Sequence, residues 1–237
     1  MQIHNSSSPP LGQDVSSFHE NGYIIAPAVY TPEEMAACKR SAQELTESQS
    51  GPSGVFVWMC DTIPSLFEGI ACHSRLMAIL QVVIGPRIEF LSAKPVFKSA
   101  QVNFPSPWHQ DQAYWGGAPK YSAWIALEDA TLENGCLKVI PGSHRSALDH
   151  AAVQDKIGFG NRILDEDLKN ETIVDAPLNA GDALIFHDCL LHSSHPNLSG
   201  RDRWSFIPTY RNADLPDLST VWSTSKHIAP CDPNHNS

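Results

Sequence analysis

The stretch WHQDQAYW, residues 108–115, places His109 and Asp111 two positions apart among aromatic and amide side chains. In an extended chain, residues i and i+2 project from the same face, so an imidazole nitrogen and a carboxylate oxygen would lie side by side. A carboxylate in apolar surroundings needs a cationic partner. The spacing therefore predicts two ligands of a metal ion, and the structural alternative is a histidine–aspartate pair on the surface.

The segment FHDCLLHSSHPN, residues 186–197, supplies three candidates for a third ligand. Two histidines and one carboxylate with open coordination positions suit non-haem iron(II), whereas tetrahedral zinc sites more often use three or four ligands in a closed arrangement. DALIFH reads as a strand with His187 at its far end, and LLHSS as the returning strand with His192 inside it. His195 precedes a proline and leaves that strand. Position favours His192, and His187 and His195 stay open as alternatives.

The composition of the chain limits the classes of protein to which it can belong. Its 237 residues are 42% hydrophobic and 18% charged, which suits one large domain with a sizeable core and excludes a disordered chain. The net charge of −10 argues against a nucleic-acid or anionic-membrane partner. Six cysteines without a CxxC spacing are interpreted as reduced. With neither a secretory signal nor a long apolar segment, we expect a cytoplasmic protein with a small-molecule substrate; the oligomeric state is not readable.

Composition changes along the chain in a way that predicts one domain with a helical and a strand-rich part. The expected divisions are a flexible N-terminal tail over residues 1–13, then a single domain over 14–237 with a helical part to about 85, a core over about 86–211 and a C-terminal extension over about 212–237.

The helical part carries clear start and stop signals. Thr31 can cap a helix, Pro32 suits its first position, and Glu34 completes a capping box, so we expect a helix that continues to about residue 48. A second helix is expected over residues 74–84, before a Gly-Pro pair. The intervening residues 49–70 are rich in glycine and proline and are expected to be irregular.

After residue 86, short β-branched and aromatic runs alternate with turn signals. The runs are RIEFLSAKPVFK, YSAWIALED, CLKVIPG, ETIVDAPL, DALIFH and RWSFIPTY. Asn134-Gly135, before CLKVI, is a hairpin signal, and we interpret it together with Gly142 as turn chemistry. Strands at this spacing predict a sandwich or barrel. The polar residues 144–170 read as an insertion, in which His144 is a turn histidine.

Three segments in this order resemble one known family. PSPWHQDQAYW, AWIALEDATLENGCLKVIPGSH and GDALIFHDCLLHSSHPNLSGRDRW are similar to the phytanoyl-CoA dioxygenase family, and the resemblance spans about residues 15–211. It implies a mainly β fold, a double-stranded β-helix (jelly-roll, cupin-like) core with flanking N-terminal α-helices. It also implies Fe(II), 2-oxoglutarate as co-substrate and O2.

The resemblance extends to individual positions. It implies that His109, Asp111 and His192 are the iron ligands. It also implies that Arg203, eleven residues after His192, binds the far carboxylate of 2-oxoglutarate. A guanidinium can bind a carboxylate through two hydrogen bonds and stays charged when buried. Arg201 competes with Arg203 for this role.

Further positions are expected near the co-substrate. The resemblance matches Ser194 to a serine that shares the far carboxylate and Trp124 to a tryptophan that lines the co-substrate, although an aromatic residue in a strand also packs in cores. We place Gln101 and Asn103 on the strand that enters the motif, within reach of the keto acid. The family often has a lysine near Lys98, whose role is open.

Four aromatic residues and Lys98 are candidates for contact with the substrate. The aromatic residues are Phe56, Trp58, Tyr114 and Trp115, and the alternative for each is that it packs over the sheet. The family's substrates include acyl-CoA thioesters, amino-acid-like compounds, phosphonates and natural products. A CoA thioester would favour a basic surface, so the acidic chain favours a small molecule of secondary metabolism.

The implied reaction is hydroxylation, desaturation or ring formation with release of succinate and CO2. Related halogenases have a small residue where Asp111 stands, so the carboxylate argues against halogenation. The alternative is a cupin-like hydrolase or isomerase that uses zinc or manganese as a Lewis acid without 2-oxoglutarate. A non-catalytic binding protein on the same scaffold is a third reading, which the intact ligand set opposes.

Overall fold

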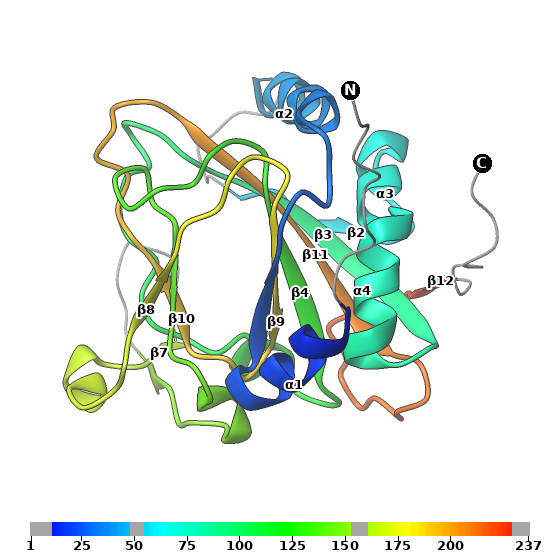
Figure 1. Cartoon of the computed structure of the whole chain (residues 1–237), viewed down its shortest axis with the longest axis vertical. Helices are drawn as coiled ribbons and strands as arrows, with labels where there is room; N and C mark the ends of the chain where they lie inside the picture. The colour runs from blue at the N-terminus through cyan, green and yellow to red at the C-terminus, as the bar shows by residue number, and fades with distance from the viewer. Residues whose placement is uncertain (1–10, 48–54, 153–160, 229–237) are drawn as a thin grey trace, which may run out of the picture.

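The computed structural model of the chain describes residues 11–47, 55–152 and 161–228. Two antiparallel sheets face each other, and helices cover the outer face of the larger one (Figure 1). This arrangement is a double-stranded β-helix, so the predicted fold class is confirmed.

The larger sheet has seven strands in the order β1-β9-β4-β11-β3-β12, with β2 paired to β3. Its strands are β1 (Tyr23–Ala26), β2 (Trp58–Met59), β3 (Ile88–Lys98), β4 (Lys120–Ala126), β9 (Ala183–His187), β11 (Arg203–Asn212) and β12 (Lys226–Ile228). The smaller sheet, in the order β10-β5-β8, contains β5 (Leu137–Val139), β8 (Val174–Ala176) and β10 (His192–Ser194). A short ribbon pairs β6 (Ala151–Ala152) with β7 (Asn161–Arg162). The strands expected after residue 86 are therefore present, although β4 begins one residue before its predicted run and β11 ends two residues after its run.

The helices bury apolar faces against the outside of the larger sheet. Four helices do so: α1 (Leu11–Asn21), α2 (Pro32–Glu47), α3 (Ser65–Ala71) and α4 (Ser74–Ile84). The short α5 (Gln112–Trp115) has no buried residue, and two 3-10 turns, η1 (Ser143–Arg145) and η2 (Asp165–Leu168), lie outside this layer. Phe67 of α3 and Leu80 of α4 are fully buried in this outer core, together with Phe206 of β11. Aromatic contacts join the layers, since the rings of Phe67 and Phe206 lie 5.3 Å apart.

A second core fills the space between the two sheets. Trp124, Leu184 and Ile207 of the larger sheet pack with Leu137 and Val139 of the smaller one. Successive strand residues point to opposite faces, so each strand of the larger sheet supplies side chains to both cores. The inner face of this sheet is therefore the one that meets the metal-ligand candidates on the smaller sheet.

The capping box at the start of α2 is confirmed. The backbone N–H of Thr31 donates to Glu34 Oε2 (2.7 Å), and the N–H of Glu34 donates to Thr31 Oγ1 (3.2 Å). The capping box thus satisfies two N–H groups at the start of the helix. The second predicted helix, residues 74–84, is α4 and has the predicted bounds.

Two expectations for the helical part are wrong. Residues 11–13, which we expected in the N-terminal tail, begin α1, because leucine and glutamine favour a helix. Residues 65–71 form α3 where an irregular segment was expected. Pro64 precedes that helix in an extended conformation, and the burial of Phe67, Ile70 and Ala71 on one side stabilises it despite its short length.

Two further expectations concern cysteines and membranes. Cys38, Cys60, Cys72, Cys136 and Cys189 are unpaired, and the sixth cysteine lies outside the described residues. Within the described ranges, no single helix is long and apolar enough to cross a membrane; α3 and α4 meet that criterion only as a pair bent by 46°.

Candidate metal and co-substrate site

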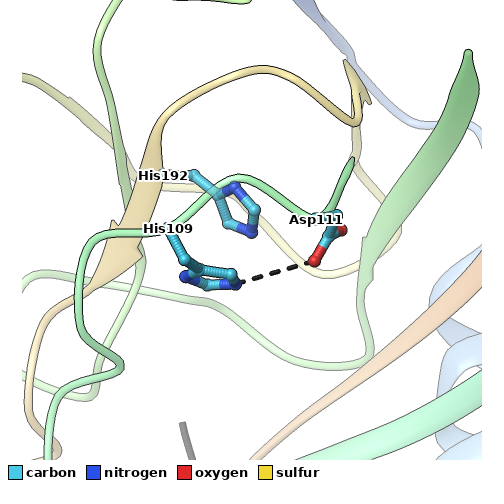
Figure 2. Close-up of side chains that lie close together, drawn as sticks. All are labelled: His109, Asp111 and His192. Carbon is cyan, nitrogen blue, oxygen red and sulfur yellow. Dashed lines mark ion pairs between the residues drawn. The ribbon is translucent and has the colours of Figure 1, made fainter. Parts of the chain in front are cut away.

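Three of the predicted ligands lie together between the sheets. The donor atoms of His109, Asp111 and His192 are all within 4.8 Å of one another and could hold a metal ion. Figure 2 shows the two imidazoles and the carboxylate close together. His109 Nε2 lies 3.6 Å from Asp111 Oδ1. The three residues are 5–6% exposed, so protein surrounds them.

A backbone bridge fixes the two histidines next to each other. The N–H of His109 donates to the carbonyl of His192, and the N–H of His192 donates to the carbonyl of His109, both at 3.1 Å. Their rings lie 4.2 Å apart between centroids. His192 belongs to β10, while His109 is paired only through this bridge.

The expected strand geometry of His109 and Asp111 is wrong. Asp111 has helical backbone angles, φ −62° and ψ −31°, and immediately precedes α5. The chain therefore turns after His109 instead of continuing as a strand. The two side chains still converge, because the turn brings the carboxylate back toward the imidazole.

Backbone hydrogen bonds orient both imidazoles. Nδ1 of His109 lies 2.9 Å from the carbonyl oxygen of Pro107, and Nδ1 of His192 lies 3.0 Å from that of Leu190. A carbonyl only accepts, so each Nδ1 carries the proton and donates it. Each Nε2 is then unprotonated and available to a metal, which is the arrangement typical of metal-binding histidines.

The electrostatics of the site favour neutral imidazoles beside an ionised carboxylate. Burial lowers the pKa of His109 to about 3, with a smaller contribution from His192. Burial likewise lowers the pKa of His192. For Asp111, burial alone would raise the pKa, but Lys94 and the two histidines together outweigh it, so the pKa is lowered. At neutral pH the set is therefore ready to bind a cation without losing protons.

Gln110 positions the two ligands that flank it, a role the sequence did not reveal. Its side chain is fully buried, and its amide nitrogen donates to the carbonyls of Ser146 (2.8 Å) and Cys189 (2.6 Å). Its amide oxygen accepts from the N–H of Leu148 (2.8 Å). The partners are distant in sequence, so the position of Gln110 between two ligands was the only available signal.

The structure separates His192 from the two alternative histidines. His195 lies near the surface, with Nε2 2.7 Å from a carboxylate oxygen of Asp175. His187 packs against Tyr121, with ring centroids 5.4 Å apart. Neither belongs to the group formed by His109 and Asp111.

His187 belongs to a second group of possible metal donors, formed with the consecutive residues Asp188 and Cys189. His187 and Asp188 each accept one backbone hydrogen bond, while Asp188 Oδ1 is buried without a hydrogen-bond partner among the described residues. Asp188 Oδ2 accepts from the N–H of Lys120 (3.0 Å), and His187 Nδ1 accepts from the N–H of Cys189 (3.0 Å). We interpret this group as the turn that joins β9 to β10.

Arg203, the predicted carboxylate ligand, is buried on the same inner face. It is 2% exposed, whereas Arg201 is exposed. Its Nη1 donates to Ser205 Oγ (3.0 Å), and its Cζ lies 5.0 Å from the ring centre of Trp124, so the tryptophan supports the guanidinium. Its Nε is buried and has no hydrogen-bond partner among the described residues. A buried donor of this kind fits an anionic ligand.

Lys98 lies opposite Arg203 in the pairing of β3 with β11. It is 8% exposed, and its Nζ donates to the carbonyl of Phe104. Burial, and next the charge of Arg203, lower the pKa of Lys98 to about 7. Two adjacent buried cations favour an anion between or beside them.

Gly135 does more than form the predicted turn. Its φ of +98° favours glycine, and an added Cβ would lie 2.7 Å from Lys98 Cδ. Its carbonyl oxygen accepts from Arg203 Nη2 (3.2 Å). The turn thus packs directly against the two buried cations.

Two predicted co-substrate residues lie in the interior. Trp124 is 4% exposed and stacks beneath Arg203. Ser194 is 4% exposed on β10, where its Oγ lies 2.9 Å from Ser106 Oγ and accepts from the N–H of Ser106. Ser194 therefore also fixes the loop that leads to His109, and its role toward the co-substrate stays a prediction.

The predicted strand position of Gln101 and Asn103 is wrong, and their contact with the co-substrate stays a prediction. β3 ends at Lys98, and both side chains are exposed in the following loop. Ser99 Oγ accepts from the N–H groups of Gln101 (3.2 Å) and Val102 (3.1 Å), which forms a serine turn and ends the strand.

The predicted substrate-contacting residues divide into two groups. Trp58 is on the wrong face, because it packs against Phe67 of α3 with rings 4.8 Å apart. Phe56 is half-buried beside β3, and its role stays a prediction. Tyr114 and Trp115 belong to α5, directly after Asp111, and the ring of Tyr114 lies 6.2 Å from that of His109. These two border the candidate metal site.

Comparison with known proteins agrees with this geometry. A family model described as phytanoyl-CoA dioxygenase (PhyH) matches residues 18–205. Phytanoyl-CoA dioxygenase domain-containing protein 1 of Danio rerio is 26% identical, and the alignment covers 89% of this chain and 92% of that protein. Phytanoyl-CoA dioxygenase 1 of Oryza sativa subsp. japonica is 28% identical over 68% of this chain and 56% of that protein.

Solved structures share the fold. The epimerase SnoN, in complex with Fe3+, alpha ketoglutarate and nogalamycin RO, has a TM-score of 0.72 and 21% identity, with 94% of this chain and 96% of that chain covered. EvdO2 from Micromonospora carbonacea var. aurantiaca, complexed with 2-oxoglutarate, has a TM-score of 0.70 and 23% identity, with 98% of both chains covered. The chain belongs to the phytanoyl-CoA dioxygenase (PhyH) family of oxygenases, which use iron(II), 2-oxoglutarate and O2.

Proposed function

We propose that this protein hydroxylates a small organic molecule, with His109, Asp111 and His192 as iron(II) ligands and Arg203 as the ligand of the far carboxylate of 2-oxoglutarate. The observation that carries the proposal is the buried group of three donor atoms within 4.8 Å of one another. Its composition, two neutral imidazoles and one carboxylate, is the one that non-haem iron oxygenases use.

The residues of the chain supply position and a protected environment. Nδ1–H donation to backbone carbonyls keeps both Nε2 atoms directed to the ligand position. Gln110 fixes the turn between the ligands. Lys98 and Arg203 together provide a buried positive region for one carboxylate of the co-substrate, and Trp124 supports the guanidinium. Burial of all these groups excludes water and strengthens their electrostatic interactions.

Bound iron(II) supplies the redox chemistry by which O2 and 2-oxoglutarate oxidise a C–H bond, with release of succinate and CO2. The carboxylate of Asp111 completes the three-ligand set, which supports hydroxylation over halogenation. The same scaffold carries other outcomes, since SnoN is described as an epimerase and SnoK as a carbocyclase. Desaturation and ring formation are therefore the nearest alternatives to hydroxylation.

The proposed substrate is a small molecule of secondary metabolism, because an acidic chain of net charge −10 does not suit a CoA thioester. A cupin-like hydrolase or isomerase is the rival function, and it would not use the buried Arg203 and Lys98 to hold a keto acid.

The test is 2-oxoglutarate consumption by the purified chain under air. We expect succinate to form only when iron(II), 2-oxoglutarate and O2 are all present, and zinc to inhibit instead of supporting turnover. Tryptophan fluorescence would report 2-oxoglutarate binding separately under nitrogen. Absence of binding, or hydrolysis or isomerisation of a substrate supported by zinc without 2-oxoglutarate, would overturn the proposal in favour of its rival.

A further inference from the structure

Lys94 is an inward-facing cation that the proposed reaction does not use. It lies on β3, four residues before Lys98, and alternate strand residues share a face. Its cross-strand partner on β11 is Ile207, which belongs to the core between the two sheets. The lysine is half-buried, and its charge acts on His109, Asp111 and His192. It therefore faces the candidate metal site.

The ammonium of Lys94 has an aromatic neighbour but no anionic partner. Its Nζ lies 5.8 Å from the ring centre of Trp115. Among the described residues it forms neither an ion pair nor a hydrogen bond. The buried Lys120, by contrast, pairs with Asp217 at 2.9 Å. A half-buried ammonium without a carboxylate partner can accept an anionic ligand at low desolvation cost.

Binding of the metal and the co-substrate increases the excess of positive charge around Lys94. The formal charges of iron(II), Arg203 and Lys94 exceed those of Asp111 and dianionic 2-oxoglutarate, so positive charge remains even before Lys98 is counted. Asp111 cannot neutralise Lys94 fully, because its single negative charge also interacts with the bound metal ion. The loaded site therefore favours a further anion near Lys94.

Two tryptophan side chains form the surface next to the ammonium of Lys94. The ring of Trp222, in the C-terminal extension, lies 5.2 Å from that of Trp115. Trp222 Nε1 donates to Ser92 Oγ (3.0 Å), and Ser92 shares the face of Lys94 on β3. An apolar wall thus stands beside the ammonium at the end of the site where α5 lies.

We propose that Lys94 binds a carboxylate of the organic substrate, while Trp115 and Trp222 pack against the adjoining apolar part. This inference rests on the proposed function and narrows it to monoanionic, amphipathic substrates. A single ammonium suits a carboxylate better than a phosphate, which typically takes several donors. Oxidation would then occur on the apolar part, near the carboxylate that Lys94 holds.

The experiment compares acids with their uncharged amides. Straight-chain carboxylates from acetate to decanoate, the corresponding primary amides and inorganic phosphate are titrated under nitrogen into protein that holds iron(II) and saturating 2-oxoglutarate. Tryptophan fluorescence and calorimetry report binding without turnover. A charge-assisted contact predicts that at least one acid binds about tenfold more tightly than its amide.

Variants assign this preference to one residue. Lys94→Met should abolish the acid preference and Lys94→Arg should retain it, with unchanged affinity for 2-oxoglutarate. Lys138→Met is the matched control, because Lys138 also lies over a tryptophan, 5.1 Å from the ring centre of Trp108, but on the outward face of β5.

Three results would overturn the inference. They are acids that bind no better than amides, a preference that survives Lys94→Met, and tighter binding of inorganic phosphate than of every acid. A fourth result would also overturn it: if Lys94→Met weakened the binding of 2-oxoglutarate as much as that of the acids, Lys94 would belong to the co-substrate site. Failure of the proposed function is distinguishable, since it would appear as lack of 2-oxoglutarate binding by the unmodified protein.

Discussion

The two faces of the larger sheet differ in the side chains that they bury: one buries apolar residues and the other buries charged ones. On the outer face, Phe90, Phe206 and Tyr210 pack against helices, and the hydroxyl of Tyr210 donates to a backbone carbonyl of α3. On the inner face, the same strands carry Lys98 and Arg203, two buried cations that no carboxylate of the described residues contacts directly. The outer face stabilises the fold, and the inner face keeps charges that only a ligand can neutralise.

The comparison shows where function lies in this fold. Apolar packing contributes in proportion to buried area, so the outer face tolerates exchange of residues of similar volume. An uncompensated buried charge lowers stability, and its persistence on one face indicates a bound anion. Substitutions on the two faces should therefore affect different measured quantities.

The largest effect is expected for Asp111→Ala. Loss of the carboxylate removes one of three metal donors, so iron affinity and the rate of succinate formation should both fall by more than about a hundredfold. This loss is larger than the one expected when a residue that only hydrogen-bonds to a metal ligand is removed. Asp175→Ala is the control, because Asp175 is a surface carboxylate that pairs with His195. Full-rate turnover by Asp111→Ala would remove Asp111 from the ligand set.

Phe67→Ala tests the outer face. Phe67 is fully buried, so its truncation should lower the free energy of unfolding by about 3–5 kcal/mol. Urea denaturation would measure this change. The affinity of the folded protein for 2-oxoglutarate should stay within about twofold, because a substitution far from the site changes stability without changing the contacts of the ligand. A large loss of affinity with little loss of stability would contradict the division between the faces.

Arg203→Met tests the inner face. The variant keeps bulk above Trp124 but removes the guanidinium, and loss of a buried charged partner costs about 2–5 kcal/mol. The requirement for 2-oxoglutarate should rise at least about thirtyfold, far more than that for the substrate. Arg201→Met, at an exposed position, should leave both unchanged. Equal effects of Arg203→Met on co-substrate and substrate would argue against the assignment.

Lys98 predicts a smaller, pH-dependent effect. Its pKa of about 7 in the folded protein, against an ordinary 10.5, means that it is charged below neutral pH and neutral above it. The affinity for 2-oxoglutarate should fall several-fold between about pH 6 and pH 8. Lys98→Met should flatten this profile, which fluorescence titrations at each pH would show.

The same lysine links pH to stability. Between the folded and ordinary pKa values, the unfolded lysine holds a proton that the folded one has lost, so the free energy of unfolding rises with pH across this window. Lys98→Met should remove this dependence and stabilise the protein below pH 7. A steeper pH dependence in the variant would exclude Lys98 as its source.

Most elements of the fold could be predicted from the sequence, because their determinants are local. Alternating apolar residues and turn signals located most strands of both sheets, but not the short β2 and β12, and a capping box located α2. The residue types of the candidate site were also visible, since histidine, aspartate and arginine at family positions indicate their chemistry. The helix α3 was missed because its stability comes from burial of Phe67 and Ile70, which no local signal shows.

What the sequence by itself determined was the set of donors and the strands that carry most of them. The tertiary structure decided how they meet: it turned the chain at Asp111, separated His192 from His187 and His195, and put Trp58 on the outer face. It alone showed that Gln110 anchors the ligand turn and that Lys94 faces the site. The physical reason is that these relations depend on contacts between residues far apart in the chain, and local patterns carry no information about them.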